Sequence, residues 1–161
     1  MKIRFNMNWK NFFITLIIVG SIAGIVASAY STLAHYDVAS SGICTINETF
    51  DCDVVNHSKY SELFGIPVAV LGLVAYVFFF FTALMVKVRV DERILNLMVF
   101  TAVFGLLFSF YLTSIEAFVL YTWCILCLIS QASIIAIAVG VFGLKKIDSK
   151  PVAPSAAELH Q

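Results

Sequence analysis

The sequence predicts an all-α integral membrane protein: a four-transmembrane-helix bundle with one long extracytoplasmic loop between the first and second helices. Two observations carry this prediction. The chain of 161 residues is 61% hydrophobic and 12% charged, whereas soluble domains are about 45–50% apolar and about one quarter charged. Its apolar runs are long enough to cross a hydrocarbon core of about 30 Å four times. The formal net charge is zero, which gives nucleic-acid binding no electrostatic support.

The first transmembrane helix is expected over residues 12–34, after a polar and basic segment at 1–10. A cleaved signal peptide is the alternative, because the Ala-Ser-Ala sequence at 27–29 resembles a cleavage site. The apolar region of a signal peptide is usually about 7–15 residues long. This run is longer, so an uncleaved helix is expected. Small residues recur in it every four positions and predict close packing against neighbouring helices: Gly20, Gly24 and Ser28.

Residues 35–64 form the long polar stretch of the chain and are expected to be the external loop. A loop of this length is often functional. It contains two of the four cysteines, Cys44 and Cys52, and its acidic side chains are opposed by a single basic residue, Lys59.

The second helix is expected over 66–86, because Pro67 suits the first turn of a helix. A short charged turn follows at 87–93. The apolar sequence beyond it is about twice the length of one span, so it predicts a hairpin of two helices, 94–118 and 123–143.

The turn of this hairpin is expected near Tyr121, Thr122 and Trp123, because Tyr and Trp favour the headgroup region. Glu116 is the only charged residue in the apolar stretch. We interpret it as a carboxylate at the membrane interface that reaches water; a functional role is the alternative.

The distribution of Lys and Arg predicts the orientation. Nine of the ten lie in the segments 1–10, 87–93 and 144–161. With four helices these segments share one side, which the positive-inside rule makes cytoplasmic. Both termini are then cytoplasmic, and 144–161 is expected to be a disordered tail after a membrane domain at 1–143. All the cysteines would face the outer compartment, where disulfides persist.

The other two cysteines, Cys124 and Cys127, form a CxxC sequence at the start of the fourth helix. The first turn of a helix favours a thiolate, which is the reactive form of cysteine. For the pair alone, the alternative is that both cysteines pack as small apolar residues.

Three functions are open to four cysteines at one membrane face. Disulfides would staple the loop to the bundle without catalysis. A metal site would combine Cys44, Cys52, His35 and His57, but this spacing differs from that of compact zinc motifs. In a relay, the loop pair would exchange disulfides with an outside protein, and the CxxC would pass the electrons to a lipid-soluble acceptor. One pair on a loop and one at a helix start favour the relay.

Several motifs, in this order, resemble the vitamin K epoxide reductase (VKOR) family, and most closely its bacterial branch. They are Cys44 followed after seven residues by Cys52, the segment from Cys52 to Ser61, the Phe-Gly-Ile-Pro sequence at 64–67, and Glu116 followed by the CxxC. The resemblance covers roughly residues 12–143. It implies a four-helix bundle around a quinone, ubiquinone or menaquinone, in the bacterial inner membrane.

For the activity, the resemblance implies a quinone-dependent thiol oxidase. Such an enzyme reoxidises a periplasmic DsbA-like thioredoxin-fold protein and so supports disulfide bond formation, as the unrelated DsbB does. The relay would run from Cys44, which meets the partner, through Cys52 and Cys124 to Cys127 beside the quinone. Bacterial relatives are often fused to a thioredoxin-like domain. This chain continues only briefly after its expected fourth helix, so its partner is expected to be a separate protein.

The resemblance also implies quinone contacts at Ser58, Ser61 and Gln131. Where the vertebrate enzymes carry Asn and Tyr that contact vitamin K, this chain has Ser61 and Gln131. The differences weaken the case for the alternative activity, reduction of vitamin K epoxide or of a quinone as substrate. Ordinary polar packing in the bundle is the other interpretation of these two residues. A non-catalytic, disulfide-stapled membrane module is the alternative from a different functional class.

Overall fold

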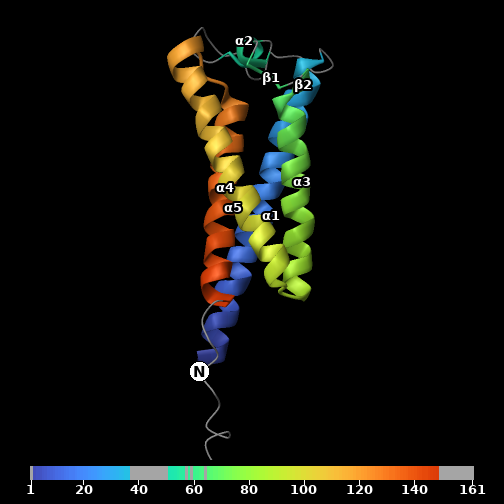
Figure 1. Cartoon of the computed structure of the whole chain (residues 1–161), viewed down its shortest axis with the longest axis vertical. Coiled ribbons are helices and arrows are strands. Elements are labelled where there is room, and N and C mark those ends of the chain that lie inside the picture. The colour runs from blue at the N-terminus through green and yellow to red at the C-terminus, as the bar shows by residue number, and fades with distance from the viewer. Residues whose placement is uncertain (1, 37–50, 57, 59, 64, 149–161) are drawn as a thin grey trace, which may run out of the picture.

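The computed structural model describes residues 2–36, 51–56, 58, 60–63 and 65–148, and its long helices run side by side (Figure 1). Four helical segments are long and apolar enough to cross a membrane, which confirms the predicted class, an all-α membrane protein with four spans. In chain order the elements are α1 (Lys2–His35), α2 (Cys52–Asn56), β1 (Glu62–Leu63), β2 (Ile66–Pro67), α3 (Val68–Val88), α4 (Glu92–Ile115), the π-helical turn η2 (Glu116–Leu120) and α5 (Ile125–Asp148).

The polar stretch between the first two spans contains the short helix α2 and a small antiparallel hairpin, β1–β2. Gly65 lies at the turn of this hairpin with φ of 79°, a conformation that glycine adopts without steric cost. Val68 closes the hairpin by donating its N–H to the Ser61 carbonyl at 2.8 Å. The structure therefore begins the second span at Val68 rather than at residue 66.

The third and fourth spans also differ in length from the sequence-based boundaries. Asp91 caps α4 by accepting the N–H of Arg93 at 2.8 Å. The π-helical turn η2 continues the third span to Leu120, where the left-handed Tyr121 (φ 52°) ends it. Helix α5 continues to Asp148, so the first residues of the segment expected as a tail are helical; residues 149–161 lie outside the described part.

Helix α1 packs mainly against α5 and α3, and its small residues make this close approach possible. A Cβ atom added at Gly24 would lie 2.4 Å from the ring of Tyr76 on α3. One added at Gly20 would lie 3.1 Å from the Ser133 carbonyl on α5. The predicted role of the small-residue stripe is confirmed, because it lets both neighbouring helices approach α1.

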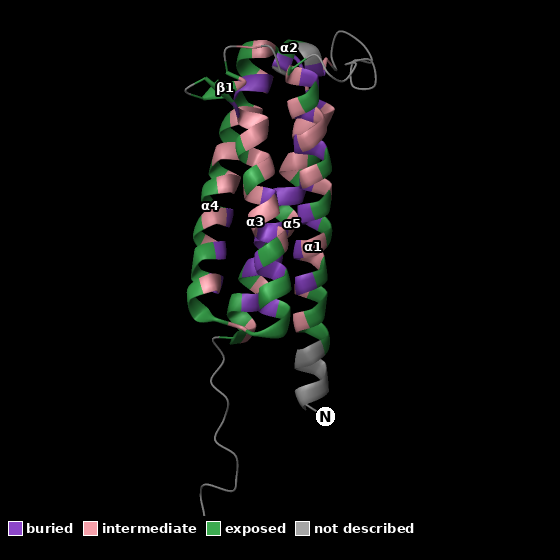
Figure 2. Ribbon diagram, turned by 90° about the vertical axis from the view of Figure 1, so that its right-hand side faces the viewer, coloured by how far each residue is buried: buried purple, intermediate pink, exposed green. Residues whose placement is uncertain are grey.

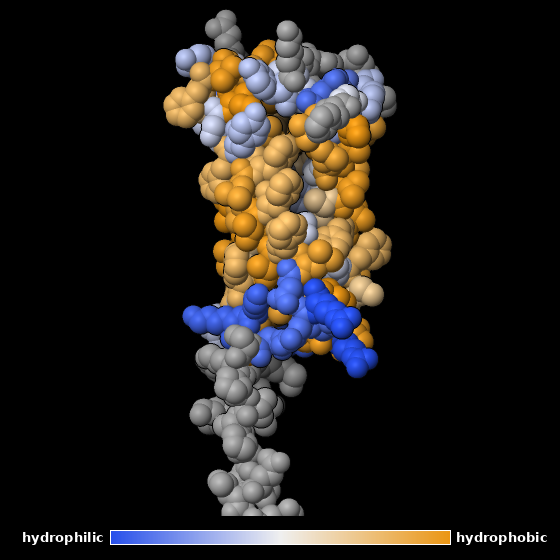
Figure 3. Space-filling model, in the orientation of Figure 1, coloured by the Kyte–Doolittle hydropathy of each residue, from blue (hydrophilic) through white to orange (hydrophobic). Residues whose placement is uncertain are grey.

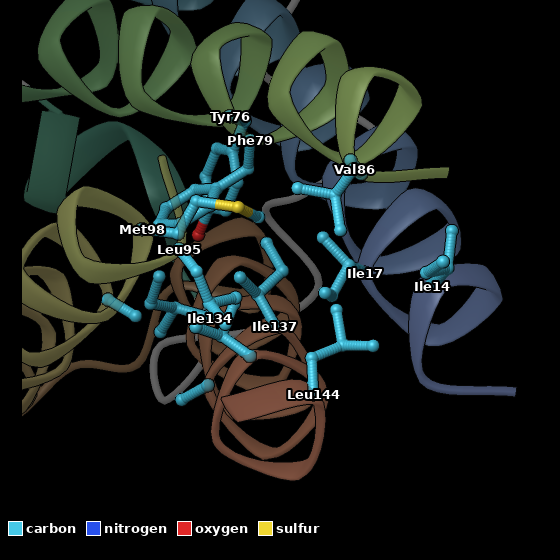
Figure 4. Packing of buried hydrophobic residues seen from close by; sticks show 14 residues of the cluster. Ile14, Ile17, Tyr76, Phe79, Val86, Leu95, Met98, Ile134, Ile137 and Leu144 are labelled. Atoms are coloured by element: carbon cyan, nitrogen blue, oxygen red, sulfur yellow. The ribbon is translucent and has the colours of Figure 1, made fainter. Parts of the chain in front are cut away.

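The main hydrophobic core fills the half of the bundle farther from α2 and the hairpin. It combines the first half of α4, around Met98, with the second half of α5, around Ile137, and with Ile17 and Phe79 (Figure 4). Buried positions line the inner faces of the helices, while the outer faces are exposed (Figure 2). In the other half of the bundle the same helices leave room for a cavity.

The surface of the bundle shows a wide hydrophobic band, with a hydrophilic end opposite to α2 and the hairpin (Figure 3). Exposed charged side chains lie at this end, in the α3–α4 turn and in the last turn of α5: Lys87, Arg89, Asp91, Glu92, Arg93, Lys145, Lys146 and Asp148. Large exposed hydrophobic residues on the band suit contact with lipid rather than water.

Candidate active site

The sulfur atoms of Cys52 and Cys124 meet where α2 lies on the end of the bundle. Cys52 is the first residue of α2, and Cys124 directly precedes α5. Their Sγ atoms are 3.3 Å apart, and the exposed fractions of the two residues are 1% and 0%. Val55 is buried with them, and Leu120 and Leu126 pack against the cluster. The structure thus brings one loop cysteine and one CxxC cysteine into contact.

The two CxxC cysteines are both free thiols, whereas Cys52 is disulfide-bonded. A thiol next to a sulfur atom of a disulfide has the arrangement required for thiol–disulfide exchange. Cys44 lies outside the described residues, so its expected contact with a partner protein stays a prediction.

Cys124 occupies the N-terminal cap position of α5, because its carbonyl accepts the N–H of Leu128 at 3.0 Å. Its sulfur in turn accepts the N–H of Cys127 at 3.4 Å, one of the first-turn amides that has no partner inside the helix. Hydrogen bonds from the Cys127 side chain and then from this N–H lower the pKa of Cys124, and they outweigh the opposing effects of burial and of Glu116. Cys124 is therefore the thiol at which a thiolate is stabilised.

Glu116 lies in this site and does not reach water. Its exposed fraction is 2%, and its Oε2 accepts the N–H of Cys124 at 3.2 Å. Its side chain also shares a hydrogen bond with the side chain of Cys127. The interpretation as a solvated interface carboxylate was wrong, because η2 continues the helix and turns this side chain toward the CxxC.

A cavity of about 410 Å³ lies beside the CxxC. Its wall is mostly apolar, and parts of all four long helices, α2 and the hairpin contribute to it. Cys127 and Glu116 line it at the end nearest α2, whereas Cys124 and Cys52 do not. Ligand sites in proteins have volumes of about 300–1,000 Å³ and mainly apolar walls with a few polar groups.

Two of the three predicted quinone-contact residues line this cavity. Ser58 and Ser61 lie in its wall, and each hydroxyl donates to a backbone carbonyl at 2.8 Å, Ser58 to Val55 and Ser61 to Ser58. Gln131 does not line the cavity. Its side chain accepts a hydrogen bond from Thr113, which does line it.

A quinone ring suits this cavity, because the wall is apolar and a thiol from the CxxC lies in it. The metal alternative finds no support in the described part of the chain, where no three His, Cys, Asp or Glu side chains are grouped to hold an ion. Two of the four residues considered for a metal, Cys44 and His57, are not described.

The sequence indicates one further polar group of this site and misses another. Glu116 is a lone charge in the apolar stretch, and an ionisable residue within a membrane span is by default a functional candidate, which is the alternative that the structure favours. Tyr76 lies in the cavity wall and donates its hydroxyl to the Ser130 carbonyl at 2.7 Å. No local pattern distinguishes Tyr76 from the other aromatic residues of α3, so only the packing of α3 against α5 reveals it.

A four-span helical bundle with free and disulfide-bonded cysteines in contact at one end defines a class of protein, the membrane-embedded thiol–disulfide oxidoreductases. The family model of the vitamin K epoxide reductase family matches residues 15–142, and this chain belongs to that family. Its members are oxidoreductases that link disulfide chemistry to quinones. A comparison with individual curated proteins finds no significant match.

Proposed function

We propose that this protein is a quinone-dependent thiol oxidase of the bacterial inner membrane, which reoxidises a separate periplasmic DsbA-like thioredoxin-fold protein. The observation that carries the proposal is the 3.3 Å contact between Cys52 and Cys124, with Cys127 in the wall of the adjacent cavity. A relay requires its sulfur atoms in a fixed spatial order. That order here is the loop sulfur of Cys52, the helix-cap sulfur of Cys124 and the cavity-lining sulfur of Cys127.

In the relay, the reduced partner attacks a loop disulfide between Cys44 and Cys52, leaves oxidised, and the loop becomes a dithiol. The Cys52 thiolate then attacks Cys124 of an oxidised CxxC, which forms a Cys52–Cys124 disulfide and releases Cys127 as a thiolate. Attack of Cys44 on Cys52 restores the loop disulfide and releases Cys124. The combination of a disulfide-bonded Cys52 with free thiols at Cys124 and Cys127 corresponds to the state after this step.

The CxxC dithiol must then lose two electrons and two protons to become a disulfide again. A bound quinone supplies a two-electron acceptor that takes up two protons. Cys127 is the residue that gives electrons to it, because Cys127 lines the cavity and Cys124 does not. Electron flow is favourable, since a DsbA-like partner has a potential of about −120 mV and a quinone of higher potential accepts its electrons.

Ser58 and Ser61 contribute to the polar end of the quinone cavity in this proposal. Their hydroxyl groups shape the segment that covers the cavity, because both donate to the backbone of the same loop. Gln131 acts one step away: it holds Thr113, a residue of the cavity wall.

Two alternatives are weaker. A disulfide-stapled module does not require free thiols at both CxxC positions, yet Cys124 and Cys127 are free. Reduction of vitamin K epoxide would use the same cysteines and the same direction of electron flow, with the epoxide in place of the quinone as acceptor. The presence of Ser61 and Gln131 instead of the vertebrate Asn and Tyr speaks against it, and so does the position of Gln131 outside the cavity wall.

The test is a turnover assay with purified protein, a reduced DsbA-like protein, and ubiquinone or menaquinone. We expect the partner to become oxidised and one quinol to form for each disulfide. Replacing Cys124 or Cys127 by Ser should abolish both. A protein that reduces vitamin K epoxide with a dithiol, but oxidises no thioredoxin-fold partner, would support the epoxide reductase activity instead.

A further inference from the structure

Glu116 is a buried carboxylate that the relay described above does not use. It lies at the start of η2, and among the described residues its side chain hydrogen-bonds to the CxxC segment: to the N–H of Cys124 at 3.2 Å and to the side chain of Cys127. In the part of the chain that the structure describes, no Lys, Arg or His forms an ion pair with it. A buried carboxyl group without a cation is costly, so its retention beside the reactive thiols requires a reason.

The contacts indicate what this side chain can exchange. The hydrogen bond between Glu116 and Cys127 connects the carboxyl group with the thiol that lines the cavity. Glu116 lines the same cavity, so the carboxyl group lies next to the space that a ligand would fill. A group within hydrogen-bond reach of the reacting atom meets the geometric requirement for a general acid or base.

We propose that Glu116 is a catalytic acid–base residue that carries the proton of Cys127. The proposal rests on the proposed relay, because Cys127 gains and loses a proton once in each cycle there. Bulk water has little access to Glu116, which is 2% exposed, and to Cys124, which is fully buried, whereas Cys127 is partly exposed. Because the carboxyl group is buried beside Cys127, a proton can pass between the two groups without entering bulk water.

Protons and electrons balance over one cycle. When Cys52 attacks Cys124, Cys127 leaves as a thiolate and takes a proton from the Glu116 carboxyl group. When the CxxC is oxidised, an S–S bond forms between Cys124 and Cys127, and two electrons pass to the quinone. The Cys127 proton returns to Glu116 and then moves to a quinone oxygen, and the proton that Cys52 lost when it became a thiolate restores the Glu116 carboxyl group. The second proton, which the cysteine pair also loses, goes to the other quinone oxygen.

Other titratable groups lie near this path. Among the described residues, those that interact with Glu116 are Cys124 and Cys127. The same cavity is lined by His35 from α1, Tyr60 from the segment before the hairpin, and Tyr76 from α3. His35 pairs with Glu62 at 3.4 Å, and the Tyr76 hydroxyl donates to the Ser130 carbonyl. Among the described residues, Glu116 is the carboxyl group that hydrogen-bonds to the Cys127 side chain.

The first experiment needs no quinone. In full-length protein with Cys44, Cys52 and Cys124 replaced by Ser, Cys127 is the one remaining thiol. The rate constant of its reaction with iodoacetamide is measured against pH. Because two hydrogen-bonded acids titrate as a coupled pair, we expect two inflections in this profile. Glu116→Gln in the same background should leave one inflection. Glu92→Gln, a matched amide replacement at an exposed carboxylate at the opposite end of the bundle, should leave two.

The second experiment uses the protein with its four cysteines, a reduced thioredoxin-fold partner and a quinone. General acid–base catalysis contributes about 10²–10⁴-fold to a rate, so Glu116→Gln should lower kcat about 100-fold. Glu116→Asp keeps an acid and should recover part of the rate, and Glu92→Gln should leave kcat unchanged. Circular dichroism of each variant shows whether the helices are intact. If Glu116→Gln does not fold, Glu116→Asp decides the point, with two inflections and a reduced kcat expected.

Two results would overturn the proposal. One is an alkylation profile that is the same with Glu and with Gln at position 116, because no proton would then be shared. The other is an unchanged kcat in Glu116→Gln. If the protein with Glu at position 116 oxidises no thioredoxin-fold partner, the proposed relay is wrong. The alkylation profile needs no quinone and no partner, so it still tests whether Glu116 shares a proton with Cys127.

Discussion

The sulfur atoms of Cys52 and Cys124 lie 3.3 Å apart, although 72 residues separate the two cysteines in the chain. This contact joins the external segment to the cap of α5, and Cys127 lies one helical step behind it in the cavity wall. The order loop sulfur, cap sulfur, cavity sulfur is thus a property of the folded bundle.

Replacing Cys127 by Ser should trap the relay halfway. Without Cys127 no CxxC disulfide can form, so the free Cys124 thiolate attacks Cys52 of the loop disulfide and releases Cys44. The Cys52–Cys124 disulfide that results has no Cys127 thiol to displace Cys52 from it, so it should accumulate. Mass spectrometry of peptides from unreduced protein would detect it. Cys124→Ser is the matched control and should give no Cys52–Cys127 disulfide, because Cys124 is the residue in contact with Cys52. An equal yield of that disulfide would contradict the order.

The thiolate of Cys124 should persist to lower pH than that of an ordinary cysteine. The hydrogen bonds from Cys127 lower the pKa of Cys124, so its reactivity is retained as pH falls and is lost only below the lowered pKa. In a background with Ser at positions 44 and 52, Cys127→Ala removes the side-chain donor, and Cys127→Ser keeps one. The rate of reaction of Cys124 with a small aromatic disulfide is followed by absorbance at a series of pH values and gives the pKa of this thiol. This pKa should rise more in the Cys127→Ala variant than in the Cys127→Ser variant.

The orientation in the membrane should follow the distribution of Lys and Arg. The charged α3–α4 turn and the end of α5 lie at the end of the bundle opposite to α2 (Figure 3). Reporter fusions after Lys10, within 87–93 and after Lys146 should read cytoplasmic, and a fusion within 40–55 should read external. An external reading after Lys146 would contradict both the orientation and the proposed periplasmic partner.

A larger side chain in the cavity should weaken the binding of the quinone without unfolding the bundle. Ala75 lies in the cavity wall, so Ala75→Phe should raise the KM for quinone about tenfold, which corresponds to about 1.4 kcal/mol of binding free energy. The neighbouring Val74 is 64% exposed on the outer face of α3. Val74→Phe should leave this KM unchanged. Equal effects of the two substitutions would show that the quinone does not use this cavity.

The sequence alone predicts the four spans and the fold class, since the hydrocarbon core of a membrane imposes a length and a composition that are readable residue by residue. The spacing of Gly20 and Gly24 predicts close helix contacts, because small residues about one turn apart lie on the same face of a helix. The order of the cysteine motifs predicts the family, and the match over residues 15–142 confirms it.

Only the tertiary structure decides which side chains are buried together at the site, because the periodicity of a single helix does not show how it packs against the others. The depth of Glu116 depends on η2 continuing the third span, and its hydrogen bonds depend on how α4 meets the start of α5. Gln131 does not line the cavity and instead accepts a hydrogen bond from Thr113, which does. Contacts between residues distant in sequence arise from the packing of whole helices, and that packing places a buried carboxyl group beside a reactive thiol.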